Sequence, residues 1–234
     1  MKQTLVFAAT VALLAGSVSA AEPKDEVVNA AKQLGEKENY SWHQTVVVPE
    51  DAQFKPGPTD GKTEKGGFTF VSVSFNDNEI KAVLKGDKGA ATNMEGEWQS
   101  LSELANSEGP GRFMAMRFRD YKTPAAQAET LATQTKGLKK DGDVISGDLT
   151  DEGAKQLLSF RRRNGGDAPT VSDAKGSVKF WVKDGTLAKY EFKVKGKMSF
   201  NGNDIDQDRT TTVVIKDVGT TKVTVPDEAK KKLS

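Results

Sequence analysis

The chain has no cysteine, a single histidine and, beyond its first twenty residues, no long apolar run. The missing cysteine excludes disulfides, thiol catalysis and a lipid anchor on an N-terminal cysteine. One histidine, His43, leaves little of the side chain on which acid–base catalysis and zinc binding most often depend. A domain without these supports must be held together by a hydrophobic core.

The chain also lacks an excess of one charge. Lys and Arg total 34 against 33 Asp and Glu, and loss of an N-terminal segment containing Lys2 would make the two equal. Balanced and interspersed charges give no general attraction to nucleic acid or to an anionic membrane. We therefore expect no nucleic-acid partner.

The first residues have the pattern of a secretory signal peptide. Lys2 supplies a positive start, residues 5–16 an apolar stretch, and Val18-Ser19-Ala20 a small-residue cleavage site. The apolar stretch is shorter than the roughly 20 residues that a spanning helix needs, and nothing later is apolar enough to span a membrane. We expect cleavage after Ala20, a periplasmic or secreted protein, and a single domain over residues 21–234.

The clearest pattern in the mature chain is an alternation of apolar and charged side chains from Gly176 to Phe200. It predicts two long strands with one dry face and one wet face. The apolar residues of the first strand are Val178, Phe180 and Val182. Those of the second are Ala188, Tyr190, Phe192, Val194, Met198 and Phe200.

The turn between these strands contains Asp184-Gly185. Cross-strand partners must share a face of the sheet, and a two-residue loop would place Phe180 opposite Lys189, on the wrong face. We therefore expect a three-residue loop, Lys183 to Gly185, with Gly185 in the left-handed conformation.

The remaining helices and strands are predicted from capping residues, from the spacing of apolar residues, and from Gly and Pro that end an element. Helices are expected over 25–34, from Ser100 through Leu104 with Glu103 completing a capping box, from Thr123 to Gly137, after Thr150 and after Pro226. Strands are expected over 40–48, 68–75, 80–84, 90–94, 144–149, 210–218 and 222–225, with a loop over 51–67. The apolar phase changes after Phe70, which predicts a bulge or a strand covered on both faces.

Strands joined by short turns cannot form a parallel sheet, so the fold class is α+β. Strands as long as these imply a strongly curved antiparallel sheet, an incomplete β-barrel. Its concave side needs filling, and the central helical block is the natural filling. The segment from Phe113 to Tyr121, rich in Phe, Met and Arg, is part of that block.

Two groups of residues are candidates for ligand binding. An apolar cavity on the concave side would be lined by Phe68, Phe70, Phe113, Met116, Phe180 and Phe192. The densest positive cluster is Arg161, Arg162 and Arg163, which could hold an anionic head group. The alternatives are that the apolar residues form a closed core and that the arginines are a solvated helix end.

The sequence specifies no cofactor, metal or catalytic residue. His43 lies on a predicted strand with no nucleophile motif, so a half-exposed strand histidine is favoured over a hydrolase. Asn203, Asp204, Asp206 and Asp208 do not have calcium-loop spacing and predict a solvated hairpin turn. Gly165-Gly166 lacks the context of a phosphate loop.

The order of elements resembles the LolA-like superfamily, the bacterial extracytoplasmic lipoprotein carriers and related lipid-binding lipoproteins. The resemblance is carried by the signal peptide, the N-terminal helix, the strand meander, the central helices, the run Gly176-Ser177-Val178-Lys179-Phe180-Trp181-Val182-Lys183-Asp184-Gly185 and the ending Val223-Thr224-Val225-Pro226. It implies an incomplete barrel around helices, with a cavity that shields acyl chains, and it transfers no individual functional residue.

The first functional hypothesis is therefore a non-enzymatic exported protein that binds or shuttles a lipid, a lipoprotein acyl chain or another apolar ligand. The second is a cell-envelope interaction or structural module whose core is filled by its own side chains. A hydrolase that uses His43 is the third. An open apolar cavity favours the first hypothesis, and a solid interior favours the second.

Overall fold

The computed structural model describes residues 22–52, 55–75, 78–159, 170–200 and 203–233. The predicted signal peptide and the Arg161–Arg163 cluster lie outside these residues. No helix in the described part is long and apolar enough to cross a membrane.

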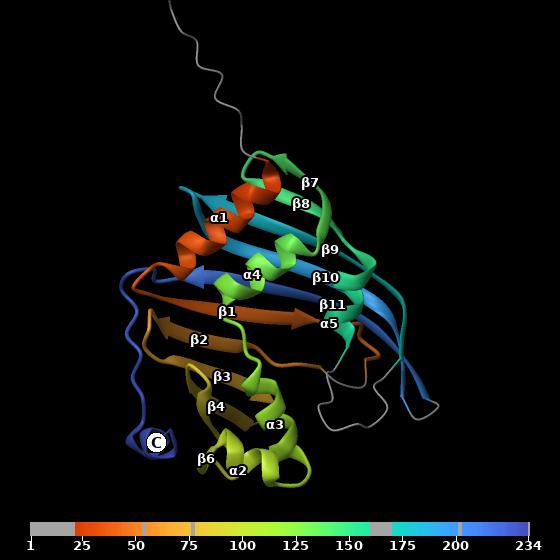
Figure 1. Ribbon diagram of the computed structural model, residues 1–234. Helices are drawn as coiled ribbons and strands as arrows, with labels where there is room; N and C mark the ends of the chain where they lie inside the picture. Colours follow the sequence, from red (N-terminus) through yellow and green to blue (C-terminus); the bar gives the residue numbers. More distant parts are fainter. Residues whose placement is uncertain (1–21, 53–54, 76–77, 160–169, 201–202, 234) are drawn as a thin grey trace, which may run out of the picture.

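Eleven antiparallel strands form one curled, open sheet (Figure 1). Their spatial order is β6-β5-β4-β3-β2-β1-β11-β10-β9-β8-β7, so β1 pairs with β11 and joins the N-terminal meander to the C-terminal strands. The strands are β1 (Asn39–Val47), β2 (Thr59–Glu64), β3 (Thr69–Phe75), β4 (Asn78–Lys85), β5 (Lys88–Thr92), β6 (Trp98–Ser100), β7 (Thr135–Asp141), β8 (Val144–Leu149), β9 (Thr170–Lys183), β10 (Thr186–Phe200) and β11 (Asn203–Lys216).

The helices lie mainly on the concave side of this sheet (Figure 1). They are α1 (Pro23–Gly35), α2 (Leu101–Asn106), α3 (Pro110–Arg119), α4 (Pro124–Thr133), α5 (Asp151–Leu158) and α6 (Asp227–Lys232). Helix α1 packs against α4 and β10, α5 packs against β9 and β10, and α2 and α3 pack against each other and β5. The predicted α+β class, a strongly curved antiparallel sheet around helices, is confirmed.

Small side chains let α1 and α4 pack closely together. In α4 the buried residues include Ala125, Ala128 and Ala132, and in α1 they include Ala30 and Ala31. Alanine faces let two helices approach closely while larger strand residues fill the remaining space. The largest fully buried side chains of the concave core are Tyr190, Phe118, Phe180, Leu34, Ile80, Leu104 and Leu131.

The expected three-residue turn after β9 is wrong. Thr186 pairs with Lys183, so Asp184 and Gly185 form a two-residue loop, and both have positive φ, 49° and 71°. This is the conformation of a type I′ hairpin turn. A bulge at Ala188 then shifts the register, and Phe180 pairs with Tyr190. Phe180 and Tyr190 therefore share a face of the sheet, as predicted. The extra residue that this requires is Ala188 in the strand and not a third residue in the turn.

Three further predictions are corrected by the structure. The expected loop 51–67 contains β2, the helix predicted to reach Gly137 ends at Thr133 and is followed by β7, and residues 222–225 form no strand. The last segment instead packs on the convex face, where Val225 and Ala229 contact Val83 with Phe68 and Phe70 against them. Strand β3 is therefore covered on both faces, which explains the phase change after Phe70.

Trp42 lies flat over a glycine of the neighbouring strand. Trp42 pairs with Gly61, and a Cβ at Gly61 would overlap three ring atoms of the Trp42 indole. Trp42 is 2 % exposed, so moving its ring disturbs the side chains that pack around it. The glycine thus provides the space that a large aromatic residue needs on the concave face.

We expect Gly61→Ala to lower the free energy of unfolding by about 1–3 kcal/mol, the usual cost of overpacking a core. Denaturant unfolding followed by Trp fluorescence measures this. Gly35→Ala is the matched control, because its Cβ would meet Ala125 Cβ at an ordinary 3.6 Å. Equal midpoints for Gly61→Ala and the parent protein would contradict the packing argument.

Candidate functional site

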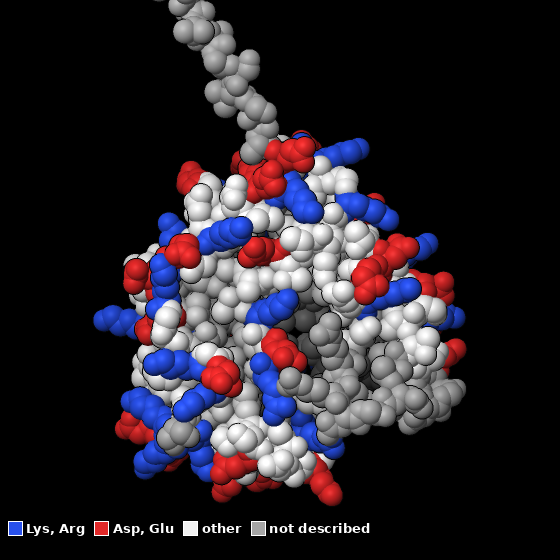
Figure 2. Space-filling view, viewed as in Figure 1, with Lys and Arg blue, Asp and Glu red and all other residues white. Residues whose placement is uncertain are grey.

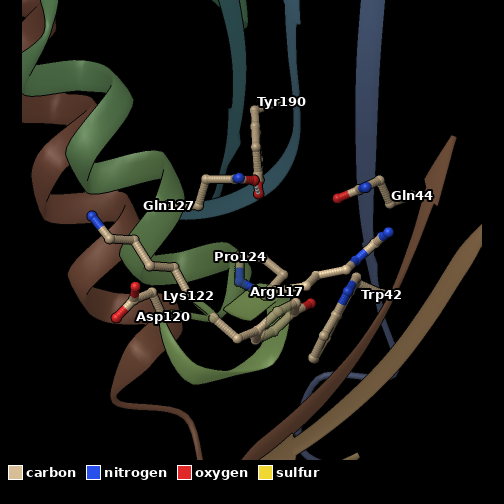
Figure 3. A pocket seen from close by; sticks show the side chains of 9 residues that line it. Trp42, Gln44, Arg117, Asp120, Lys122, Pro124, Gln127 and Tyr190 are labelled. Atoms are coloured by element: carbon tan, nitrogen blue, oxygen red, sulfur yellow. Dashed lines mark hydrogen bonds between the residues drawn. The ribbon is translucent and has the colours of Figure 1, made fainter. Parts of the chain in front are cut away.

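A pocket of about 250 Å³ opens on the concave side, between the helices and strands β1 and β10. Its mouth lies in the hollowed part of the face shown in Figure 2, where basic and acidic side chains surround it. The strands supply the floor, and the end of α3, the start of α4 and the connection between them supply the wall (Figure 3). The lining residues are Trp42, Gln44, Arg117, Asp120, Tyr121, Lys122, Pro124, Gln127 and Tyr190.

Aromatic residues form the floor and one side of this pocket. Trp42 and Gln44 are two residues apart on β1, so both side chains lie on its concave face. The Trp42 ring stacks on the Tyr121 ring, with 6.5 Å between the two centroids. Tyr190 comes from β10 and is fully buried, and its hydroxyl donates a hydrogen bond of 2.6 Å to Gln127 Oε1 of α4. This bond fixes the orientation of the Gln127 amide.

Arg117, in the last turn of α3, brings a positive charge to the pocket. Its side chain reaches from the helix toward Gln44 and Trp42 (Figure 3). The residue is exposed as a whole, and partial desolvation in this hollow lowers the pKa of the Arg117 guanidinium. Among the described residues no carboxylate lies within ion-pair distance of it, whereas Lys122 donates to Thr130 Oγ1 at 2.9 Å.

A second hollow of about 170 Å³ lies on the other side of the α3–α4 connection. Tyr121 lines both hollows, so its ring and the adjoining backbone separate them. The remaining lining residues of the second hollow are Gly67, Thr69, Leu84, Lys85, Gly86, Asp87, Lys88, Leu101, Phe118, Arg119 and Thr123.

The six residues expected to line an apolar cavity do not come together. Phe180 and Phe192 are buried in the main core. Phe68 and Phe70 lie on the convex face under the C-terminal segment, because strand alternation turns them away from Val71. Phe113 and Met116 are 47 % and 43 % exposed, because α3 turns Met114, Ala115 and Phe118 inward instead.

His43 and the acidic residues of β11 lie away from the pocket. His43 is half-buried on the face opposite Trp42, and its Nδ1 is 2.8 Å from Asp60 Oδ1. Asp204, Asp206 and Asp208 belong to β11 and pair with β10 rather than forming the expected turn. The described residues include no group of three or more His, Asp or Glu placed to hold a metal.

Sequence reasoning missed the polar residues of the pocket. It identified the 113–121 segment as rich in Phe, Met and Arg but assigned no role to Arg117, and it gave no role to Gln44 or Gln127. One signal was available: Gln44 follows Trp42 at a spacing of two, which places an amide on a face that otherwise carries aromatic side chains.

No family model and no curated protein matches the sequence. Solved structures similar to this chain include lipoprotein LppX from Mycobacterium tuberculosis, with 10 % identity, coverage of 86 % of this chain and 97 % of that one, and a TM-score of 0.44. LprF from Mycobacterium bovis has 10 % identity, 90 % and 98 % coverage and a TM-score of 0.43. A LolA superfamily protein from Nitrosomonas europaea has 10 % identity, 92 % and 98 % coverage and a TM-score of 0.36. At this level the similarities carry no argument about a ligand.

All three tyrosines of the chain lie around this site, and burial raises the pKa of each. A phenol whose folded pKa exceeds its unfolded value of about 10 stabilises the protein below pH 10, and that stabilisation is lost as the pH rises further. We therefore expect the free energy of unfolding to fall above pH 10. Tyrosinate absorbance should appear together with unfolding; its appearance in the folded protein near pH 10 would contradict the buried placement.

Proposed function

We propose that the protein is a non-enzymatic exported binding protein that takes up a lipid, a lipoprotein acyl chain or another apolar ligand on the concave side of its sheet. The observation that carries the proposal is the pair of hollows on either side of Tyr121, both lying between the helices and the sheet. Together they mark a path along the concave face beneath the α3–α4 connection.

The size of the hollows supports binding only when they are joined. Ligand pockets usually measure about 300–1,000 Å³. The two hollows, about 250 and 170 Å³, each fall below that range, but joined they would lie within it. A ligand that occupies both must therefore displace the ring of Tyr121.

The connection between α3 and α4 is suited to such a displacement. Helix α3 ends at Arg119 and α4 begins at Pro124. Between them the Tyr121 amide makes a long hydrogen bond of 3.4 Å to the Phe118 carbonyl. Displacing the Tyr121 ring breaks its contacts with Trp42 and Phe118, and each methylene of a bound chain offsets this cost by about 0.8 kcal/mol when it leaves water.

The solid part of the interior favours the second hypothesis, an envelope module without a ligand. Phe118, Phe180 and Tyr190 are fully buried and fill much of the concave side. On that hypothesis the hollows hold water only, and no acyl chain binds. The enzyme hypothesis has less support, because His43 faces away from the pocket and already pairs with Asp60.

Tyr121→Ala is expected to join the two hollows and to raise the affinity for a fluorescent C16 fatty-acid probe by about tenfold, because the ligand no longer has to displace the ring. Tyr121→Phe is the control, since it keeps the ring that separates the hollows. Circular dichroism and thermal unfolding confirm that both variants are folded. Absence of probe binding to the parent protein and to Tyr121→Ala would refute the carrier proposal and leave the envelope module.

Native mass spectrometry of the protein purified from its own envelope provides an independent test of the same proposal. A co-purifying lipid that is released by solvent extraction is the expected result. Recovery of the bare chain alone, under conditions that keep the protein folded, would support a self-filled core.

A further inference from the structure

We infer that the pocket beside Tyr121 is selective for the anionic head group of an amphiphile, a carboxylate or a phosphate, and that Arg117 is the residue that binds it. This inference rests on the proposed function, because it assumes that the apolar part of the ligand occupies the concave side. It adds the chemical class of the ligand, which the fold alone does not define.

Arg117 has no acidic partner among the described residues. Several other described lysines pair with acidic side chains, such as Lys140 with Glu26 at 2.7 Å and Lys193 with Asp208 at 3.3 Å. Arg117 reaches into a hollow, and none of the described carboxylates pairs with it. Arg117 is exposed, so its guanidinium is accessible to an anion that enters the hollow.

The charged groups at the rim leave Arg117 available. Asp120 and Lys122 both belong to the α3–α4 connection, and in Figure 3 they extend away from the side on which the Arg117 guanidinium lies. Lys122 is engaged with Thr130 Oγ1. Since Asp120 and Lys122 have opposite charges, the net charge of the lining residues is that of Arg117.

The neutral polar groups of the pocket also present donors. Because Gln127 Oε1 accepts the Tyr190 hydroxyl, the NH₂ group of Gln127 is left as a donor. Gln44 points into the pocket from the opposite side, across from Gln127 (Figure 3). A guanidinium with amide donors nearby matches the oxygens of a carboxylate or phosphate, and charge-assisted bonds of this kind are the strong ones.

The position of Arg117 explains how one ligand could use both parts of the site. Arg117 precedes Tyr121 by four residues, and Tyr121 lines both the pocket and the second hollow. A head group held by Arg117 would therefore place the attached chain against Tyr121 and the concave face. The local charge, and not the overall charge of the chain, provides the selectivity, because the total is close to zero.

The test compares a C18 fatty acid with its methyl ester, two ligands that differ in the head-group charge, by isothermal titration calorimetry at concentrations below micelle formation. The acid is expected to bind the parent protein at least tenfold more tightly than the ester. Arg117→Gln should reduce the affinity for the acid about tenfold and leave the affinity for the ester unchanged. Arg112→Gln is the control, because Arg112 is exposed on the same helix and lines neither hollow.

Each other outcome has a defined meaning. Equal binding of acid and ester, or an equal loss of both in Arg117→Gln, would overturn the anion selectivity while the proposed function stands. Failure of both ligands to bind the folded parent protein would overturn the proposed function and this inference with it. Inorganic phosphate forms the last arm: if it binds in an Arg117-dependent manner and the amphiphiles do not, the site serves a free anion and the inference is overturned.

Discussion

The structure depends on the covering of the concave face of the β8–β11 strands by α1 and α4. The face consists of large side chains, among them Phe180, Tyr190 and Val213, that alternate with charged residues on the wet side. A curved sheet with such a face is stable only if something dry lies against it. Helix α1 meets this need directly because it packs on β10, and α4 packs against α1, where a Cβ at Gly35 would meet Ala125 at an ordinary contact distance.

The space for a ligand is found where this close covering ends. Helices α1 and α4 cover one half of the sheet, and α2 and α3 lie toward the other half, near β5 and β6 (Figure 1). The α3–α4 connection crosses the gap between them above Trp42. Because it is not helical, it cannot fill the gap with a regular face of side chains, and two hollows remain beside Tyr121. The pocket is thus a consequence of how the helical block is divided.

The elements that the sequence predicts correctly are those marked by local chemistry. Ser100 and Glu103 form the capping box, the Thr150 hydroxyl accepts from the Gly153 amide, and β8 has its predicted bounds. Strand β2 was missed because its inward residues are Thr59, Gly61 and Thr63. These are not apolar, and Gly61 is small because Trp42 lies over it, which is a tertiary reason that no local pattern reveals. The bulge at Ala188 was missed because the alternation of apolar and charged residues fits two geometries equally well. One is a three-residue turn, and the other is a two-residue turn followed by a bulge in the strand.

The candidate site was harder to predict than the fold because the local sequence does not indicate where its side chains lie. Aromatic residues on a concave strand are expected in a core, and Phe180 and Phe192 became core. An arginine in the last turn of a helix is expected to point to solvent and to favour the helix dipole. Arg117 suits the dipole and is exposed, yet its side chain reaches back over the sheet to a hollow, where partial desolvation lowers the pKa of its guanidinium. Neither the helix dipole nor the alternation along the strands predicts that this guanidinium turns toward one of the two hollows, because its position depends on how α3 lies over the sheet.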